Sequence, residues 1–477
     1  MAAAPSVTAE GSLYELVARG NKDAFFYQDF FNSKYIFENS YKPQPPTSFE
    51  IRRIPPKSAA EFGRTVEFDI DLVGDMLRKP TILIQLPSWL PPTIAANVSS
   101  SLITDLSGVS YGYTKGIAYF LFEQIEIYQD TILLQEFSGD ALWALSSIQG
   151  TLASGLVTAS LTGEHDGSVV SISRNAAPQQ LRLEIPFLGS QQDSEPGFPL
   201  RAVTKHVFRI RAKLRKLEDL IECSDPLVVT KPNPWGRSDF QQQLSRTGTP
   251  IPFTTLEKRN MQPILLQLET TQVYTSHELQ CTLQTTPLKL PFCRIYESIY
   301  TQNQKDYAGV VAGGASYITR RLEGRHPVGK ILFYFRSLKD VNANRLWKIS
   351  VGNTSGPFYN TLTFLVAGQT REAPRTSLIW RDITNHAKED IDPGIEMNTI
   401  NWTLGDTVRK RAGFEDRQPD GAVNFSTADK PTFYMDLALS PIDPLTGAPN
   451  TELHVLVEGW ALYQTDGKGR GELFSFN

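Results

Sequence analysis

Apolar and polar residues alternate with a period of two in several segments, and this pattern constrains the fold more than any other feature of the sequence. Between Val66 and Leu72 every second residue is apolar, and the residues between are acidic. Such alternation places one kind of side chain on each face of a half-buried β-strand. No segment shows the convincing long repeat of an amphipathic helix. We therefore predict an all-β protein with few short helices.

The most regular alternation runs from Lys205 to Leu217, where basic residues occupy one face and apolar residues the other. This basic face has two interpretations. It either binds an acidic neighbour or a lipid or nucleic-acid phosphate, or it is the solvated outer face of a strand, where charge discourages edge pairing. We favour the solvated face. Its members are Arg209, Arg211, Lys213 and Arg215.

Other segments of the first half predict particular elements. The apolar run Thr81–Leu86 predicts a strand that ends at the following prolines, because proline cannot donate to a sheet. Two further strands are expected over Ile117–Tyr128 and Thr131–Phe137, and Gln129-Asp130 between them suits a hairpin turn. The segment Asp140–Ile148 predicts a short helix.

A second series of strand-like runs follows a segment rich in proline and glycine, residues 223–252, whose composition breaks regular structure. We expect an N-terminal arm at 1–45, a first domain at 46–222, a linker at 223–252 and a second domain at 253–477. Two sets of short strands predict tandem antiparallel sandwiches. The runs of the second series are Ile264–Glu269, Glu278–Leu283, Lys330–Phe335, Leu346–Val351, Leu362–Val366, Phe433–Leu439 and Leu453–Leu462.

The arm is too aromatic for a solvated tail. Exposure of its aromatic side chains to water is unfavourable, so we expect the arm to lie on another surface. They include Phe25, Phe26, Phe30, Phe31, Tyr35 and Phe37.

Charge and cysteine content argue against several classes of protein. A formal net charge of -4 is not typical of a dedicated nucleic-acid binder. The three cysteines, Cys223, Cys281 and Cys293, are odd in number and lack the paired spacing of a zinc site. The sequence contains neither a signal-peptide pattern nor an apolar run long enough to span a membrane. We expect neither secretion nor an integral membrane protein.

No pattern identifies a catalytic, cofactor-binding or metal-ligating residue. The loop Gly163–Gly167 offers acid and base groups, but a turn composition explains it equally well. Gly309–Ala315 lacks the Gly-Lys-Ser/Thr of a phosphate-binding loop. The histidines lack metal-ligand spacing, and the tryptophans are more typical of core or interface anchors than of a sugar cleft. These residues are His165, His206, His277, His326, His386, His454, Trp89, Trp143, Trp235, Trp347, Trp380, Trp402 and Trp460.

Four segments, in order along the chain, carry a family resemblance. They are Gly11–Gly20 with the following Asp23-Ala-Phe-Phe, then Gly324–Tyr334, Gly421–Asp429 and Gly469–Asn477. The third is similar to a Gly-x-x-Asn-Phe-Ser-Arg-x-Asp signature, with Thr427 in place of the arginine. Together they resemble the major capsid protein family of nucleocytoplasmic large DNA viruses, of the iridovirus and chlorovirus type.

The resemblance implies two eight-stranded antiparallel jelly rolls in tandem and a homotrimer of pseudo-hexagonal outline. It implies a structural major capsid protein of an icosahedral virus, without enzymatic activity or cofactor. The expected partners are copies of itself, minor capsid proteins and penton proteins, with the arm near an inner membrane or minor proteins and no direct nucleic-acid binding. The expected location is the virion capsid, after assembly in a virus factory of the host cytoplasm. Leu90–Tyr113, Arg371–Thr399 and Arg409–Gly421 are candidate tower or trimer loops.

Two alternatives belong to other classes: a carbohydrate-binding or carbohydrate-cleaving tandem jelly roll, and a virion attachment protein. A glycosidase needs two carboxylates at a defined separation, and no spacing in the sequence identifies such a pair. An attachment protein would bind a receptor as an isolated trimer.

Overall fold

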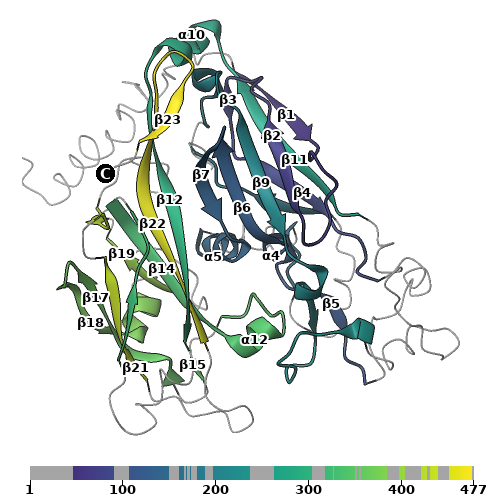
Figure 1. Ribbon diagram of the computed structural model, residues 1–477, viewed down its shortest axis with the longest axis vertical. Coiled ribbons are helices and arrows are strands. Elements are labelled where there is room, and N and C mark those ends of the chain that lie inside the picture. Colours follow the sequence, from purple (N-terminus) through teal and green to yellow (C-terminus); the bar gives the residue numbers. More distant parts are fainter. Residues whose placement is uncertain are drawn as a thin grey trace, which may run out of the picture. The chain divides into compact units, whose positions relative to one another are not determined.

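The first set of strands forms two four-stranded antiparallel paths, β1-β11-β4-β8 and β2-β9-β6-β7 (Figure 1). The computed structural model describes residues 47–90, 107–149, 161–165, 168, 172, 180–188, 197–236, 263–302, 317–325, 327–349, 352–353, 356–383, 397–402, 421–426, 430–438 and 451–474. The strands are β1 (Ser48–Ile54), β2 (Thr65–Ile70), β4 (Thr81–Gln85), β6 (Phe122–Gln129), β7 (Ile132–Phe137), β8 (Gln180–Glu184), β9 (Phe208–Leu214) and β11 (Leu265–Tyr274).

The second set repeats this arrangement, with the paths β12-β22-β14-β19 and β13-β21-β17-β18. Counted along the chain, each set pairs its strands in the orders 1-8-3-6 and 2-7-4-5. This is the strand order of a jelly roll, in which two antiparallel sheets pack around one core. The strands are β12 (Lys289–Gln302), β13 (Tyr317–Arg321), β14 (Pro327–Ser337), β17 (Tyr359–Val366), β18 (Gln369–Thr376), β19 (Asn398–Asn401), β21 (Thr432–Leu437) and β22 (Thr451–Thr465).

Strand β11 differs from the expected division of the chain. The boundary drawn after residue 252 assigned it to the second domain, but β11 pairs with β1 and β4 in the first set. It supplies the eighth strand, without which β1 would have no described partner in its sheet. The Pro/Gly-rich segment after residue 223 therefore lies between the seventh and eighth strands of the first jelly roll.

Smaller elements complete these two units. Strand β3 (Met76–Leu77) pairs with β11, and β20 (Val423–Asn424) and β23 (Gly471–Phe474) extend the sheet of β22. Two-stranded sheets are formed by β5 (Tyr111–Tyr113) with β10 (Ile221–Cys223), and by β15 (Gly352–Asn353) with β16 (Gly356–Pro357). Helices and helical turns are α4 (Ile117–Phe120), α5 (Gly139–Gln149), η1 (Leu200–Val203), η2 (Leu217–Asp219), η3 (Pro234–Gly236), α10 (His277–Thr285), α12 (Leu338–Asn342) and η4 (Ile379–Ile383).

The alternating segments are strands, as predicted. In β2 the side chains of Val66, Phe68 and Ile70 are buried between the sheets, while the intervening acidic residues are half-buried on the outer face. The 81–86 strand, the hairpin of β6 and β7 and the short helix α5 are confirmed. At the hairpin turn Asp130 has a φ of 53°, a left-handed conformation that aspartate tolerates better than most residues.

Three predicted strands are wrong in part or whole. Residues 117–120 form helix α4 ahead of β6, after Gly116 in the left-handed conformation. The segment Glu278–Leu283 lies in helix α10, where only Leu283 is buried. The described part of Leu346–Val351, residues 346–349, contains no strand.

Several expectations lie outside the described residues. They include the arm at 1–45, Gly309–Ala315, His326, His386, most of Leu90–Tyr113 and nearly all of Arg409–Gly421. The expectation of a loop over Arg371–Thr399 is wrong in part, because this range contains the end of β18, the turn η4 and the start of β19. Among the described helices, none has the length and apolar character needed to cross a membrane.

Candidate functional site at the joint between the jelly rolls

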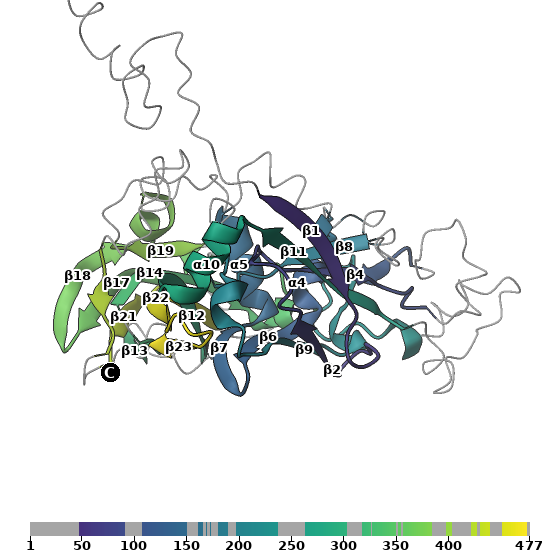
Figure 2. The same cartoon turned by 90° about the horizontal axis from the view of Figure 1, so that it is seen from above.

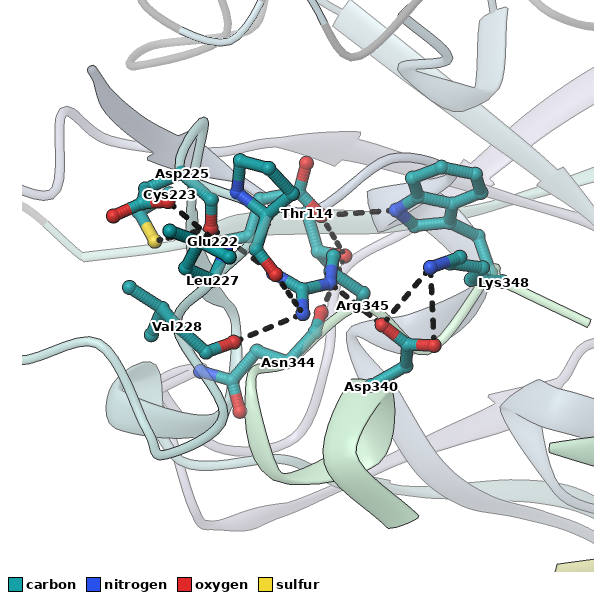
Figure 3. Close-up of polar contacts among 12 residues, drawn as sticks. Thr114, Glu222, Cys223, Asp225, Leu227, Val228, Asp340, Asn344, Arg345 and Lys348 are labelled. Atoms are coloured by element: carbon teal, nitrogen blue, oxygen red, sulfur yellow. Dashed lines mark hydrogen bonds and ion pairs between the residues drawn. The ribbon is translucent and has the colours of Figure 1, made fainter. Parts of the chain in front are cut away.

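A buried carboxylate of the first jelly roll, Glu222 on β10, anchors one part of the joint. Its Oε2 accepts a hydrogen bond of 3.0 Å from the indole of Trp347 in the second jelly roll. The Thr114 hydroxyl lies 2.9 Å from Glu222 Oε2 and 2.9 Å from the Asn344 carbonyl oxygen (Figure 3). On its other side, Glu222 Oε1 lies 3.2 Å from His165 Nε2. These contacts compensate the cost of burying a carboxylate.

Asn344 fixes the turn that follows helix α12. Its φ of 61° is left-handed, and asparagine is one of the residues that visit this conformation readily. Its side-chain amide donates to the carbonyls of Glu218 at 2.8 Å and of Ile221 at 2.7 Å. Backbone conformation and side chain thus act together to hold a turn of the second jelly roll against β10 of the first.

Arg345, next in sequence, holds a turn of the first jelly roll. Its buried guanidinium donates to the carbonyls of Asp225 at 3.3 Å and Val228 at 2.9 Å (Figure 3). The Nε of Arg345 donates to Asp340 at 2.9 Å, and Lys348 approaches the same carboxylate at 3.2 Å. One cation therefore connects α12 to the backbone of the Pro/Gly-rich segment and gives that segment a defined start.

A buried ion-pair cluster forms a second part of the joint. Asp140 of α5 accepts hydrogen bonds from Arg215, the residue after β9, at 2.6 Å and from Arg336 of β14 at 2.8 Å. Burial alone would raise the pKa of the Asp140 carboxyl, but the charges of Arg336 and Arg215 outweigh it and hold this pKa well below its ordinary range. Asp140 is therefore ionised at neutral pH. The cluster links helix α5 of one jelly roll to a central strand of the other.

Apolar packing continues across the same joint. The rings of Trp143 and Tyr334 pack edge to face with their centroids 6.4 Å apart, and those of Phe198 and Tyr463 do so with centroids 5.4 Å apart. Leu346 and Leu456 of the second jelly roll belong to the same buried cluster as the core of the first. A joint of this extent and apolar character argues against free motion of one domain over the other.

A third group of polar contacts lies where the β6–β7 hairpin meets the end of β22. Gln129 donates to the Gly471 carbonyl at 2.6 Å and accepts from the Tyr463 hydroxyl at 2.9 Å. The Gly471 amide donates to His206 Nε2 at 3.0 Å, so Nε2 is the acceptor nitrogen and Nδ1 is the one that faces Asp130 at 2.6 Å. The first residue of β23 is thereby attached to the first jelly roll.

The basic face of β9 is neutralised by its neighbouring strands. Arg209 pairs with Asp69 at 3.0 Å and Lys213 with Glu123 at 2.7 Å. Arg211 lies 3.7 Å from Glu126. The acidic partner that the sequence left open is thus supplied by the carboxylates of the adjacent strands β2 and β6. Three of the four cations are more than a third exposed, and Arg215 instead enters the buried cluster.

The other sequence candidates do not converge on one site. The described histidines lie apart: His165 and His206 at the joint, His277 exposed on α10, and His454 buried against Tyr334 with ring centroids 4.9 Å apart. Among the described residues no group of His, Cys, Asp or Glu could hold a metal. The tryptophans are buried or half-buried, and Trp89 and Trp235 pack edge to face with ring centroids 5.8 Å apart.

Residues that the sequence did not single out form most of the joint: Asp140, Glu222, Arg336, Asn344 and Arg345. They do not form a motif along the chain, and their partners are often more than 100 positions away. No spacing along the chain signals such contacts.

Two segments that carry the family resemblance meet in space. Pro327 of β14 pairs with Asn424 of β20, and Val328 with Val423. A Cβ on Gly324 would lie 2.9 Å from the ring of Phe425, so the absent side chain leaves room for this aromatic. The two motifs thus form one packed corner of the second jelly roll.

Neither a protein-family model nor a curated protein matches the sequence. The structure nevertheless resembles solved capsid proteins. A chain of the PBCV-1 virus capsid is 12% identical and matches 93% of this chain and 100% of its own, with a TM-score of 0.65. The Faustovirus major capsid protein is 12% identical over 96% of this chain and 98% of its own, with a TM-score of 0.57. A chain of the Sputnik virophage is 9% identical over 93% and 92%, with a TM-score of 0.54. This protein therefore has the double jelly-roll fold, shared with viral capsid proteins over nearly its whole length.

Proposed function

We propose that this protein is the structural major capsid protein of an icosahedral large DNA virus and is not an enzyme. The observation that carries the proposal is the buried joint, which makes one building block of two jelly rolls with the same strand order. Three such chains would present six similar domains around a closed threefold ring. The fold shared with viral capsid proteins supports this role.

In this proposal the chain forms homotrimers of pseudo-hexagonal outline that pack side by side in the shell. Its partners are other copies of the chain, minor capsid proteins and penton proteins, and nucleic acid is not bound directly. Assembly takes place in the host cytoplasm. The paired charges on the face of β9 support the absence of nucleic-acid binding, because these cations already have carboxylate partners.

We place the limits of the domains by their strands. The first jelly roll extends from β1 to the end of β11 at Tyr274, and the second from β12 at Lys289 onward. The Pro/Gly-rich segment is then a long excursion inside the first domain, held at its start by Arg345.

The native mass tests the proposed assembly. Light scattering of the purified chain should give a particle of about 160 kDa, three times 53.3 kDa, and negative-stain images should show a hexagonal outline. A monodisperse monomer that cannot be driven to assemble would contradict the proposal and favour a tandem jelly-roll binding protein or enzyme.

Residues 1–45 would contact minor capsid proteins near the inner membrane. Deleting residues 1–40 should leave trimers intact but weaken binding to a vesicle-bound minor protein layer. Monomers after this deletion would contradict the assigned role of the arm.

A further inference from the structure

The internal repeat of the chain shows which elements of the two jelly rolls correspond. Counted along each set of strands, β1, β4, β7 and β11 of the first jelly roll match β12, β14, β18 and β22 of the second. A helical segment follows the fifth strand in both sets, α5 after β7 and η4 after β18. The surroundings of an element in one jelly roll can therefore be compared with those of its counterpart in the other.

The joint within the chain brings together two unlike surfaces. The first jelly roll contributes Asp140 and Trp143 of α5, together with strand β7, which lies against β12. We call α5 with β7, and likewise η4 with β18, a helix surface. The second jelly roll contributes the face of β12, β14 and β22 on which Tyr334 lies opposite His454, and both of these side chains are buried. We call this face, and its counterpart on β1, β4 and β11, a sheet surface.

The sheet surface of the first jelly roll is open. The side chains of Leu266 and Leu268 lie in the core, so the alternate residues of β11 and the residues opposite them in β1 and β4 lie on the outer face. At one end of this face Leu265 is 56% exposed, and at the other end Phe49 and Ile51 are 74% and 56% exposed. The matching surface of the second jelly roll is buried in the joint.

This open face has the same mixture of groups as the joint. Between its apolar ends, the buried carboxylate of Glu269 lies 3.2 Å from Arg53 and 3.7 Å from Arg182. In the joint, the pair of Asp140 and Arg336 likewise lies among apolar and aromatic side chains. The face therefore has the character of an interface that lacks its partner.

The helix surface of the second jelly roll is also open. Leu378 directly precedes η4 and is 55% exposed, whereas Asp140 and Trp143 on the matching helix of the first jelly roll are buried. Strand β18 pairs with β17 and with no other described strand. In Figure 2, β18 and β1 each lie at the margin of their sheet. One chain thus carries an open copy of each surface that the joint uses.

We propose that the sheet surface of the first jelly roll binds the helix surface of the second jelly roll of another copy. Each pair of copies then repeats the contact that every chain makes within itself. Because the two surfaces differ, the contact is head-to-tail, and such contacts close into a ring when the rotation permits. In a ring of three copies, Leu265 and Leu378 are buried at all three contacts. The contact presupposes the proposed trimer and adds which faces meet there.

Thiol crosslinking tests which faces meet. The full-length chain carries Leu265→Cys and Leu378→Cys, with Cys281→Ser to remove the exposed natural thiol, and is treated with a short bis-maleimide. We expect products with the masses of two and three chains and none larger, because the ring closes at three. Peptide mapping should place the link between the two introduced cysteines. Each single variant should remain at the mass of one chain.

The native mass separates this contact from the proposed function. Trimers by light scattering that give no crosslinks in the double variant, or crosslinks between chains in either single variant, would overturn the assigned faces and leave the trimer intact. A monomeric wild type would contradict the proposed function and this contact together.

Charge exchange provides a second readout with a matched control. Leu265→Glu and Leu378→Lys should each weaken trimer association at least about tenfold, which corresponds to about 1.4 kcal/mol, because each places a charge in an apolar contact. The double variant should recover much of this loss, since the two new charges are complementary. Leu227→Glu is the control, because Leu227 is 78% exposed and lies on neither surface. Equal association of all these variants and the wild type would refute the contact.

Discussion

The ion-pair cluster at Asp140 gives the sharpest test of the joint. Asp140→Asn preserves the shape of the side chain but leaves the charges of Arg336 and Arg215 without their shared anion. The side chain of Arg336 is 2% exposed and that of Asp140 is 8% exposed, so water cannot replace the lost partner. Removal of one member of a buried pair costs about 3–5 kcal/mol. We expect the free energy of unfolding to fall by that amount.

The assay is equilibrium unfolding in urea, followed by tryptophan fluorescence, to which Trp143 in the joint contributes along with the other tryptophans. Asp69→Asn is the matched control, because Asp69 pairs with Lys57 and Arg209 on the outer face and its side chain is 39% exposed. Exposed pairs contribute about 0–1 kcal/mol, so this variant should unfold almost as the wild type does. Both variants lose one carboxylate, and only the location differs.

A double variant separates the pair from its surroundings. Asp140→Asn combined with Arg336→Met should lose less free energy than the sum of the two single changes, because the second change removes the orphaned charge. If Asp140→Asn destabilises no more than Asp69→Asn, or if the effects of Asp140→Asn and Arg336→Met are additive, the cluster does not stabilise the joint through its buried charges.

Three further predictions concern the same joint. Asn344→Ala should lower the free energy of unfolding in urea by about 2–4 kcal/mol, because it combines left-handed backbone strain with two carbonyls left without their donor. Asn344→Gly should avoid the strain and lower it by about 1–3 kcal/mol. Equal losses in the two variants would contradict a role for the left-handed φ. Arg345→Lys should increase proteolysis between residues 223 and 236, since one ammonium cannot reach all the carbonyls that the guanidinium holds, and unchanged cleavage would contradict the clamp. The pKa of Asp140 lies below its ordinary 3.8, so its contribution is full above that pH and is lost as the pH falls through the lowered pKa. Acid unfolding below about pH 4 should therefore be steeper in the wild type than in Asp140→Asn.

The strands that could be predicted are those with one apolar and one polar face. The alternation in β2 and β9 reports burial directly, since the side-chain period of a strand is two. The same rule fails for Glu278–Leu283, where Leu279, Cys281 and Leu283 also alternate. That segment forms α10 after Ser276, and short alternating runs do not distinguish a strand from an exposed helix.

The division of the chain and the joint could not be predicted in the same way. A Pro/Gly-rich stretch marks a break in regular structure, but it does not say whether the next strand returns to the earlier sheet, as β11 does. The joint depends on single residues such as Glu222 and Arg345, whose partners are set by the three-dimensional packing and leave no periodic trace. The family resemblance supplied the jelly-roll topology, which the alternation alone left open.

The position of β11 has a consequence for the synthesis of the chain. Strand β1 ends at Ile54 but its sheet partner ends only at Tyr274, so the ribosome must add 220 residues between them. At roughly 5–20 residues per second, the nascent first domain waits about 10–40 s for its central strand. During that interval β1 and β4 lack the strand that pairs with both of them in the finished sheet. A fragment that stops at residue 252 would remain permanently in this state, and we expect it to aggregate where a fragment ending after Tyr274 folds.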